Sequence, residues 1–272
     1  MTTSPIRVMG IVNVTPDSFS DGGRYLGHDA ALAHARRLIA DGADILDIGG
    51  ESTRPGAEPV DEAEEIARTV PLIAAIRAES AIPLSIDTMK PAVARAAVAA
   101  GATMWNDVAA LRVSPDAPVV AAELGCEVVL MHMLGEPRTM QDAPTYDDVA
   151  LEVEAFLLTR AEVAVAAGVQ RDKIWLDPGI GFGKTPDHNL ALLAALPRLC
   201  SHGYRVLLGA SRKRFIAALD PLAKAAEDRL GGSLAAALHG ARSGVAAVRV
   251  HDVRETVQAL GVQAAITRHA PL

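Results

Sequence analysis

Short apolar runs alternate along the chain with longer, alanine-rich amphipathic stretches. Residues 28–42, HDAALAHARRLIADG, place Ala31, Ala35 and Leu38 on one face, and Gly42 follows where a helix stop is expected. The apolar runs predict buried strands over residues 7–13, 44–50, 83–88, 103–108, 126–132, 173–178, 205–211 and 245–251. The intervening stretches predict helices over residues 28–42, 61–79, 91–100, 116–124, 146–168, 187–196, 229–242 and 252–267.

This alternation of strand and helix is typical of an α/β fold, and the length suits a single (β/α)8 TIM barrel spanning residues 1–272. We expect Pro71 to kink or divide the second helix. A doubly wound sheet would share the alternation, but it usually has a G-x-G-x-x-G directly after the first strand. Here that place holds GIVNVTPDSF, and the later GIGFG at 179–183 lacks the third glycine. The barrel is therefore the preferred interpretation.

Charge, cysteine spacing and hydropathy exclude several classes of binding partner. The net charge is -7 and no long block of like charge occurs, so the chain has no basic footprint for nucleic acid. Cys126 and Cys200 lie far apart and outside any metal-ligand spacing, which indicates a reducing compartment. The sequence has neither a signal-like start nor an apolar segment of membrane-spanning length, so we expect a cytoplasmic protein without a membrane partner.

Polar side chains end nearly every apolar run. In a barrel these positions meet at the carboxyl-end rim, where the chemistry of the fold is found. A single polar residue there could be a helix cap or the start of a solvated loop, but a set on one rim indicates a site. The residues at these ends are Asn13, Gly49, Gly50, Glu51, Asp87, Asn106, Asp107, His132, Asp177, Ser211, Arg212, Lys213, Arg249 and His251, and all but the two glycines have polar or charged side chains.

The rim has a chemical logic. Asp87, Asn106 and Asp177 could converge on a flat heterocycle, since a carboxylate that accepts two parallel N–H bonds suits a 2-amino-4-oxo-pyrimidine edge. Lys213, Arg249 and His251 follow the last two strands, where barrels often bind phosphate. The loop at 49–59 and the run SRKRF at 211–215 add cations, hydroxyls and backbone N–H groups, which we interpret as an anion site.

Two other chemistries fit less well. Lys213 could form a Schiff base as in barrel aldolases, but Asp177 is the only clear acid or base nearby on the sixth and seventh strands. A hydrolytic metal site would need ligand pairs such as HExxH, and His132 stands alone between Met131 and Met133.

Eight motifs in order, MGIVNVTPDSFSDGG, GGESTRPGA, SIDT, ND, LMHM, DPGIGFGK, GASRKRF and VRVHDV, make the chain resemble the dihydropteroate synthases of bacterial folate biosynthesis. The resemblance runs from about residue 6 to 266. It implies condensation of 6-hydroxymethyl-7,8-dihydropterin pyrophosphate with para-aminobenzoate, with Mg2+, in a sulfonamide-target transferase that forms a homodimer. Internal packing explains the alanine-rich helix at 233–244 as well as a dimer face does.

The resemblance also implies residue roles. Asp87, Asp177, Lys213 and Arg249 would be catalytic. The pterin would lie against Asp87, Asn106, Met131, Asp177, Gly181, Phe182 and Lys213. The pyrophosphate would meet Asn13, Arg249 and His251, with Asn13 also assisting the metal. The para-aminobenzoate would lie against Phe19, Thr53, Arg54, Pro55, Ser211 and Lys213. Residues 15–23 would form a lid over that site, and the segment at 220–233 has no predicted role.

Two alternatives stay open at this point. A corrinoid-dependent methyltransferase that uses methyltetrahydrofolate resembles this family in its pterin pocket, but it would leave the SRK and RVH motifs unexplained. A non-catalytic paralogue could bind pterin or phosphate as a sensor. Pyrophosphate release that depends on para-aminobenzoate would distinguish both from a synthase.

Overall fold

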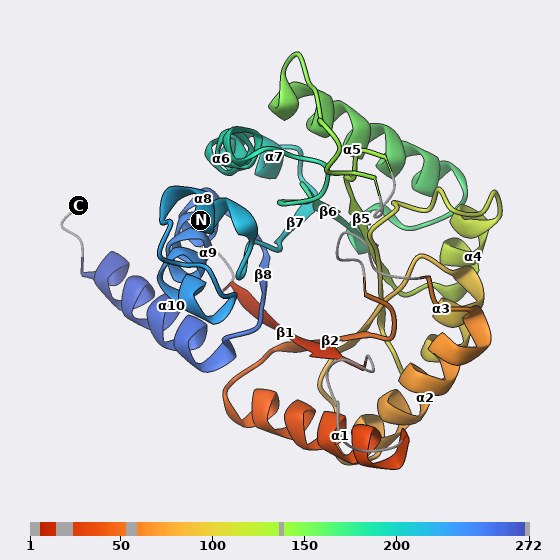
Figure 1. The fold of residues 1–272 in the computed structure, drawn as a ribbon. Coiled ribbons are helices and arrows are strands. Elements are labelled where there is room, and N and C mark those ends of the chain that lie inside the picture. The colour runs from red at the N-terminus through yellow and green to blue at the C-terminus, as the bar shows by residue number, and fades with distance from the viewer. Residues whose placement is uncertain (1–5, 15–23, 53–58, 136–138, 270–272) are drawn as a thin grey trace.

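Parallel strands form a closed barrel in which neighbours follow chain order and β8 pairs with β1 (Figure 1). The structure is a computed structural model, which describes residues 6–14, 24–52, 59–135 and 139–269. The strands are β1 (Arg7–Asn13), β2 (Ile45–Gly49), β3 (Leu84–Asp87), β4 (Met104–Asp107), β5 (Glu127–Met131), β6 (Ile174–Asp177), β7 (Arg205–Leu208) and β8 (Ala247–Val250). The (β/α)8 barrel expected from the alternating pattern is confirmed.

Helices surround the barrel and cover its outer face (Figure 1). They are α1 (Arg24–Ala40), α2 (Glu62–Glu79), α3 (Pro91–Ala99), α4 (Ala117–Leu124), α5 (Val149–Ala166), α6 (Pro186–Ala194), α7 (Leu196–Cys200), α8 (Arg214–Leu219), α9 (Leu230–Ser243) and α10 (Val253–Arg268), with 3-10 turns η2 (Arg171–Lys173) and η3 (Glu227–Arg229). The short helices α7 and α8 lie beyond the expected pattern. Among the helices of the described ranges, none combines the length and the apolar character needed to cross a membrane.

Of the two expected effects of Pro71, a kink or a division of the helix, division does not occur: helix α2 runs through Pro71 without a break. Asp61 begins the helix by accepting a 2.8 Å hydrogen bond from the backbone N–H of Glu64. Leu72, Ile73 and Ile76 follow the proline and are buried in the core. Tertiary packing beyond the proline outweighs the hydrogen bond that its missing N–H removes, so the helix continues.

Apolar side chains fill the barrel in two layers. Large residues of the strands pack inside it, including Met9, Met104 and Trp175, which are almost wholly buried. A larger cluster lies between the strands and the helices and includes Ile48 of β2 and Leu157 of α5. The interior is therefore a packed core, and the space for chemistry lies at the rim above it.

The segment at 220–233, for which the sequence predicted no role, supports the turn that follows β7. Arg229 donates to the carbonyls of Arg212 (2.9 Å) and Ala223 (3.1 Å). Ser233 accepts a 2.8 Å bond from the backbone N–H of Arg212, whose φ is +57°. These bonds hold Arg212 in a left-handed conformation that is uncommon for a residue with a side chain.

Candidate active site at the carboxyl ends of the strands

The strand register gathers the predicted polar residues at one rim. Asn13 lies opposite Gly49, Gly49 opposite Asp87, and Asp87 opposite Asn106, so these positions are adjacent across β1 to β4. A Cβ on Gly49 would lie 3.7 Å from both Asn13 Oδ1 and Asp87 Oδ2. The glycine therefore keeps open a space that an amide oxygen and a carboxylate share.

Arg249 on β8 binds two carboxylates across the rim. Its Nε donates to Asp47 Oδ2 at 2.5 Å and its Nη2 donates to Asp87 Oδ2 at 2.7 Å. Asn106 Nδ2 donates to the same Asp47 oxygen at 3.1 Å. These bonds join the predicted pterin residues Asp87 and Asn106 to the predicted pyrophosphate residue Arg249 in one network.

Burial and charge set the protonation of this network. Burial raises the pKa of Asp87 to about 7, since desolvation outweighs the nearby Arg249. Burial lowers the pKa of Arg249, but Asp47 and Asp87 more than offset this and hold its pKa above the usual value. The guanidinium is therefore a permanent cation at the rim, whereas Asp87 titrates close to neutral pH.

Asp47 is the network residue that the sequence analysis missed. It lies within the apolar run DILDIGG, is fully buried, and its Oδ1 has no hydrogen-bond partner among the described residues. The available signal was a lone carboxylate within a buried strand, two residues before Gly49 and therefore on the same face. The sequence prediction considered only the last residues of each strand, so it did not include Asp47.

Asp177 ends β6 on another side of the rim. Its Oδ1 accepts a 2.7 Å hydrogen bond from the backbone N–H of Gly179, and the residue is 5% exposed. Burial raises its pKa to about 6, with the Gly179 bond and then Lys213 acting in the opposite direction. A ligand that donates N–H bonds would favour the ionised carboxylate.

Lys213 and an apolar wall lie beside Asp177. Lys213 Nζ lies 4.1 Å from the centre of the Phe182 ring, and a Cβ on Gly181 would lie 3.0 Å from Lys213 Cδ. Met131 is buried in a cluster with Val108, Met133 and Met140, against which Phe182 and Met89 pack. The four residues expected to line the pterin pocket beside the acids are thus close together: Met131, Gly181, Phe182 and Lys213.

Ser211 and His251 bind each other between β7 and β8. The Ser211 hydroxyl lies 3.0 Å from His251 Nδ1 and accepts a 3.2 Å bond from the His251 backbone N–H. Burial lowers the pKa of His251 to about 3, and the neighbouring Arg249 contributes in the same direction. At neutral pH His251 is therefore a neutral hydrogen-bonding side chain, and Lys213 and Arg249 are the cations at this part of the rim.

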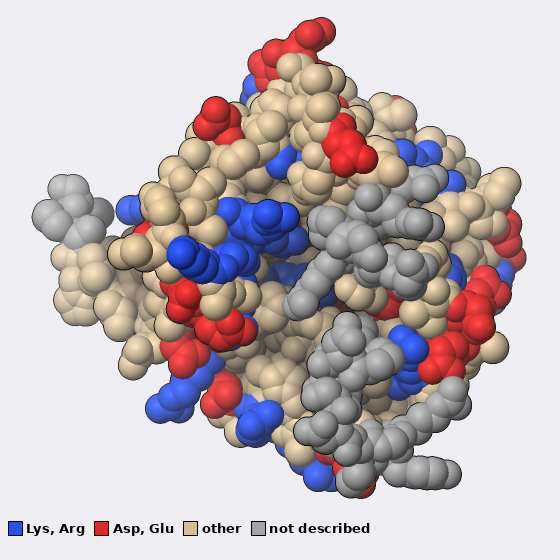
Figure 2. Space-filling view, in the orientation of Figure 1, with Lys and Arg blue, Asp and Glu red and all other residues tan. Residues whose placement is uncertain are grey.

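Arg212 pairs with a carboxylate of the protein, whereas the SRKRF motif predicted a contact with a bound anion. Its guanidinium makes two bonds to Asp252, of 3.0 Å and 2.6 Å. This pairing accounts for one cation of SRKRF without a bound anion. Lys and Arg side chains still gather over α8 and the ends of β7 and β8, beside the hollow of this face (Figure 2). Lys213 and Arg249 are therefore the cations that best support an anion site at this rim.

Two other rim residues serve the fold. Glu51 pairs with Lys90, whose Nζ also donates to the buried Glu65 at 2.6 Å. Asp107 accepts 2.7 Å bonds from the backbone N–H groups of Ala109 and Leu111. These interactions shape the turns after β2 and β4 and give neither carboxylate a role in the site.

Part of the predicted site falls outside the described residues. Phe19 and the expected lid at 15–23 lie there, as do Thr53, Arg54 and Pro55. Of the residues expected to meet para-aminobenzoate, the structure describes Ser211 and Lys213.

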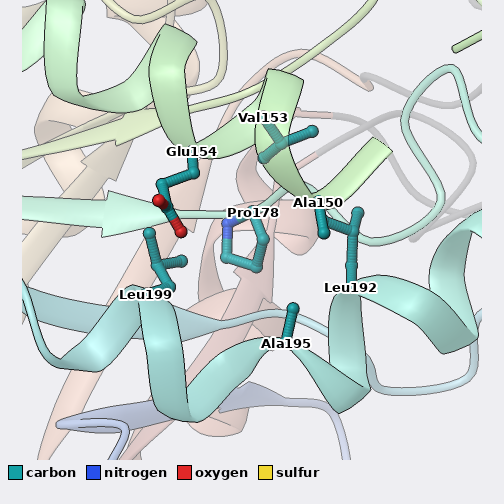
Figure 3. A pocket seen from close by; sticks show the side chains of 7 residues that line it. All are labelled: Ala150, Val153, Glu154, Pro178, Leu192, Ala195 and Leu199. Atoms are coloured by element: carbon teal, nitrogen blue, oxygen red, sulfur yellow. The ribbon is translucent and has the colours of Figure 1, made fainter. Parts of the chain in front are cut away.

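A crevice also lies behind β6, between α5 and the helices α6 and α7 (Figure 3). Pro178, Val153 and Leu192 give it mainly apolar walls, and Glu154 at its edge pairs with Arg198 at 2.7 Å. Of the described residues that line it, only Glu154 is polar, so the crevice is a gap in helix packing rather than a competing site.

Comparisons with known proteins agree with this arrangement. A family model described as pterin binding enzyme matches residues 9–251. The dihydropteroate synthase of Escherichia coli (strain K12) is 46% identical over 256 residues, which cover 94% of this chain and 90% of that protein. The structure of Xanthomonas albilineans dihydropteroate synthase with 4-aminobenzoic acid has a TM-score of 0.92 at 53% identity, covering 100% of this chain and 96% of that one. The same enzyme in complex with 7,8-dihydropteroate has a TM-score of 0.89 at 50% identity, covering 100% and 97%.

Proposed function

The chain belongs to the pterin-binding enzyme family, and from this premise we infer that it catalyses the dihydropteroate synthase reaction. This transferase reaction condenses 6-hydroxymethyl-7,8-dihydropterin pyrophosphate with para-aminobenzoate, releasing 7,8-dihydropteroate and pyrophosphate. The observation that carries the inference is one rim on which Asp87, Asn106 and Asp177 lie with the permanent cation Arg249. Its acceptors match an aminopyrimidine edge, and its cation matches a pyrophosphate.

The pterin lies between the two acidic sides of the rim. Asp177 accepts N–H bonds from the amino-pyrimidine edge, and Asp87 and Asn106 complete the donor and acceptor pattern from β3 and β4. Phe182, Gly181, Met131 and Lys213 cover the ring with mostly apolar surface. Support comes from the burial of both carboxylates, because a buried acid gains from ligand donors that water no longer supplies.

The pyrophosphate lies beside Arg249, Lys213 and His251. Two N–H groups of Arg249 bind carboxylates, and its remaining N–H groups can donate to phosphate oxygens. Ser211 lies against His251 Nδ1, so a neutral imidazole can present its Nε2–H to the same anion. Preorganised donors of this kind are each worth on the order of 3 kcal/mol of barrier in enzymes that stabilise developing negative charge.

A magnesium ion would accompany the pyrophosphate in this proposal, and Asn13 is the protein residue that would hold it. The fit rests on Asn13 Oδ1, a hard oxygen close to the open space above Gly49. Mg2+ usually keeps several waters and binds substrate phosphates, so it needs no cage of protein ligands. Among the described residues, three His, Cys, Asp or Glu side chains are nowhere grouped as metal ligands. When bound, the ion would neutralise charge that builds up on the leaving pyrophosphate.

In the chemical step, the bond from the pterin methylene carbon to the pyrophosphate oxygen breaks, and its electron pair leaves with pyrophosphate. The aromatic amine of para-aminobenzoate forms the new carbon–nitrogen bond and then loses a proton. Since the amine is a neutral nucleophile and pyrophosphate a good leaving group, the protein needs no strong base. Its residues hold the two substrates in line and stabilise departing charge. Ser211 and Lys213 meet para-aminobenzoate, together with Phe19, Thr53, Arg54 and Pro55.

The protein acts as a homodimer in this proposal. The alanine side of α9 is used within the subunit, because Ala236 and Ala237 are buried and a Cβ on Gly240 would lie 2.7 Å from a Leu208 methyl group. Helix α10 instead leaves Val262 and Ile266 exposed, at 56% and 67%. Light scattering should give twice the 28.4 kDa chain mass. A monomer at micromolar concentration would contradict the dimer without affecting the assigned reaction.

A direct assay tests the function. Purified protein with pterin pyrophosphate and Mg2+ should release pyrophosphate only when para-aminobenzoate is added, and 7,8-dihydropteroate should appear in equal amount. Release without the amine would indicate a hydrolase. Binding of the pterin without turnover would indicate a sensor, and either result would overturn the proposed function.

A further inference from the structure

A buried lysine fastens the loop at 179–184, which carries Gly181 and Phe182. Lys184 is 3% exposed although it belongs to a loop. Its Nζ lies 2.9 Å from His132 Nδ1, 2.9 Å from the Phe182 carbonyl and 3.3 Å from the His132 carbonyl. A lysine ammonium group has three N–H donors, and here each has an acceptor.

His132 is a rigid acceptor for this lysine. It directly follows β5, and its backbone N–H donates to the Asp177 carbonyl at 3.0 Å, which extends the pairing of β5 with β6. Its ring packs edge-on against Phe156 with 4.8 Å between centres. Burial lowers the pKa of His132 to about 3, so the imidazole is neutral and Nδ1 can accept. Burial likewise lowers the pKa of Lys184, to about 7.

The loop packs closely against the residues that follow β5. A Cβ on Gly179 would lie 1.9 Å from the His132 carbonyl oxygen, and one on Gly183 would lie 2.8 Å from Leu134 Cβ. Both glycines have positive φ, as Gly181 between them does. The loop can therefore lie flat against residues 132–134 only because these positions lack side chains.

Polar side chains satisfy the backbone of the same loop. Tyr146 donates to the Gly183 carbonyl at 2.8 Å, and Gln141 donates to the Gly181 carbonyl at 2.6 Å. Asn189 accepts from the Gly181 N–H at 2.7 Å. Lys184 differs from these contacts because its Nζ makes two bonds to His132, the residue that follows β5, and a third to the Phe182 carbonyl within the loop.

We propose that Lys184 is a positioning residue for the pterin: by binding His132 and the Phe182 carbonyl, it sets the distance between the loop at 179–184 and the acids of the rim. The inference rests on the proposed function, because it takes Gly181 and Phe182 as the covering wall of the pterin pocket. Lys184 does not touch the substrate in this scheme. It acts through Phe182, whose ring also contacts Lys213.

The test replaces Lys184 by Met, which keeps a long apolar chain and removes all three donors. The Kd for pterin pyrophosphate should rise about tenfold, whereas the KM for para-aminobenzoate should change less than about threefold, because a small displacement of one wall affects one substrate. Lys184→Gln keeps two N–H donors on a side chain one atom shorter and should fall between Met and wild type. It also carries the test if Lys184→Met fails to fold.

Lys173→Met is the matched control. Lys173 also donates to a backbone carbonyl, that of Gly125 at 2.6 Å, but it precedes β6 at the opposite end of the barrel. This variant should leave both substrate constants unchanged. A Lys184→Met protein with wild-type pterin affinity would overturn the positioning role while leaving the proposed function intact.

Hydrogen exchange provides a readout that does not depend on turnover. In the free protein, exchange at the amides of Gly179, Gly181 and Phe182 should quicken in Lys184→Met and stay unchanged in Lys173→Met. Unchanged exchange in both variants would contradict the claim that Lys184 holds the loop at 179–184 in place. If wild type fails to bind pterin pyrophosphate, the proposed function falls, and the exchange result alone decides whether Lys184 orders the loop.

Discussion

Two sides of the rim are built in different ways. On β2, β3, β4 and β8, side chains bind one another: Arg249 joins Asp47 and Asp87, and Asn106 shares an Asp47 oxygen. Beyond β5 and β6, side chains bind backbone instead, as Lys184 and Tyr146 do with the loop at 179–184. On the first side, a ligand can form new hydrogen bonds to the charged side chains. The second side gives the ligand a surface of fixed shape.

Changes on the first side should therefore affect the chemical step, and changes on the second should affect how well the pterin fits. Replacing a group on the charged side removes stabilisation of a leaving anion. Loosening the backbone-held side alters how closely the pterin is covered.

Arg249→Ala should have the largest effect among changes on the charged side. It removes the permanent cation and leaves Asp47 and Asp87 buried without their partner, so kcat should fall about 10²–10³-fold. Steady-state kinetics with both substrates measures this. Retained kcat with a rise only in the KM for para-aminobenzoate would contradict the role of Arg249 in stabilising the leaving pyrophosphate.

Asp47→Asn should have a smaller effect of the same kind. The amide keeps the size of the side chain but lacks the charge that holds Arg249 Nε, and the lost charge-assisted bond should lower kcat/KM by about tenfold. Its thermal midpoint should fall as well, because Asp47 Oδ2 accepts from both Arg249 Nε and Asn106 Nδ2 in the buried network. Wild-type kinetics would mean that Arg249 needs no such support.

Proton release on binding should be detectable near pH 6. Burial raises the pKa of Asp177 to about 6 and of Asp87 to about 7, so both are partly protonated there in the free protein. For these acids the contribution to stability present at low pH is lost as pH rises through 6 to 7, whereas ligand N–H donors favour the ionised forms. Calorimetry with 6-hydroxymethyl-7,8-dihydropterin in buffers of different ionisation enthalpy should detect proton release at pH 6 and little at pH 8. Equal release at both would rule out this protonation scheme.

Arg212→Met should affect stability more than catalysis. The paired Asp252 would lose two hydrogen bonds, which should lower the free energy of unfolding by about 1–2 kcal/mol while kcat stays within about threefold. Arg95→Met, in the exposed pair with Glu123, should cost less than about 0.5 kcal/mol. Urea unfolding measures the free energy of unfolding of both variants. A large loss of kcat in Arg212→Met would instead indicate that Arg212 takes part in the active site.

The fold could be read from the sequence because strands and helices leave strong periodic signals, and the strand ends then located Asp87, Asn106, Asp177 and Arg249. Three features could not be read. Asp47 lies within an apolar run, so the pattern hid it. The neutrality of His251 depends on burial beside Arg249. The pairing of Arg212 joins residues 40 positions apart, which spacing along the chain does not reveal.

Binding of pterin pyrophosphate shows whether both sides of the rim hold one ligand. Calorimetric titration with pterin pyrophosphate should give binding for wild type and none for Asp87→Ala, on the charged side, or for Asp177→Ala, next to the backbone-held loop. Normal affinity in either variant would contradict a pterin site shared between the two sides.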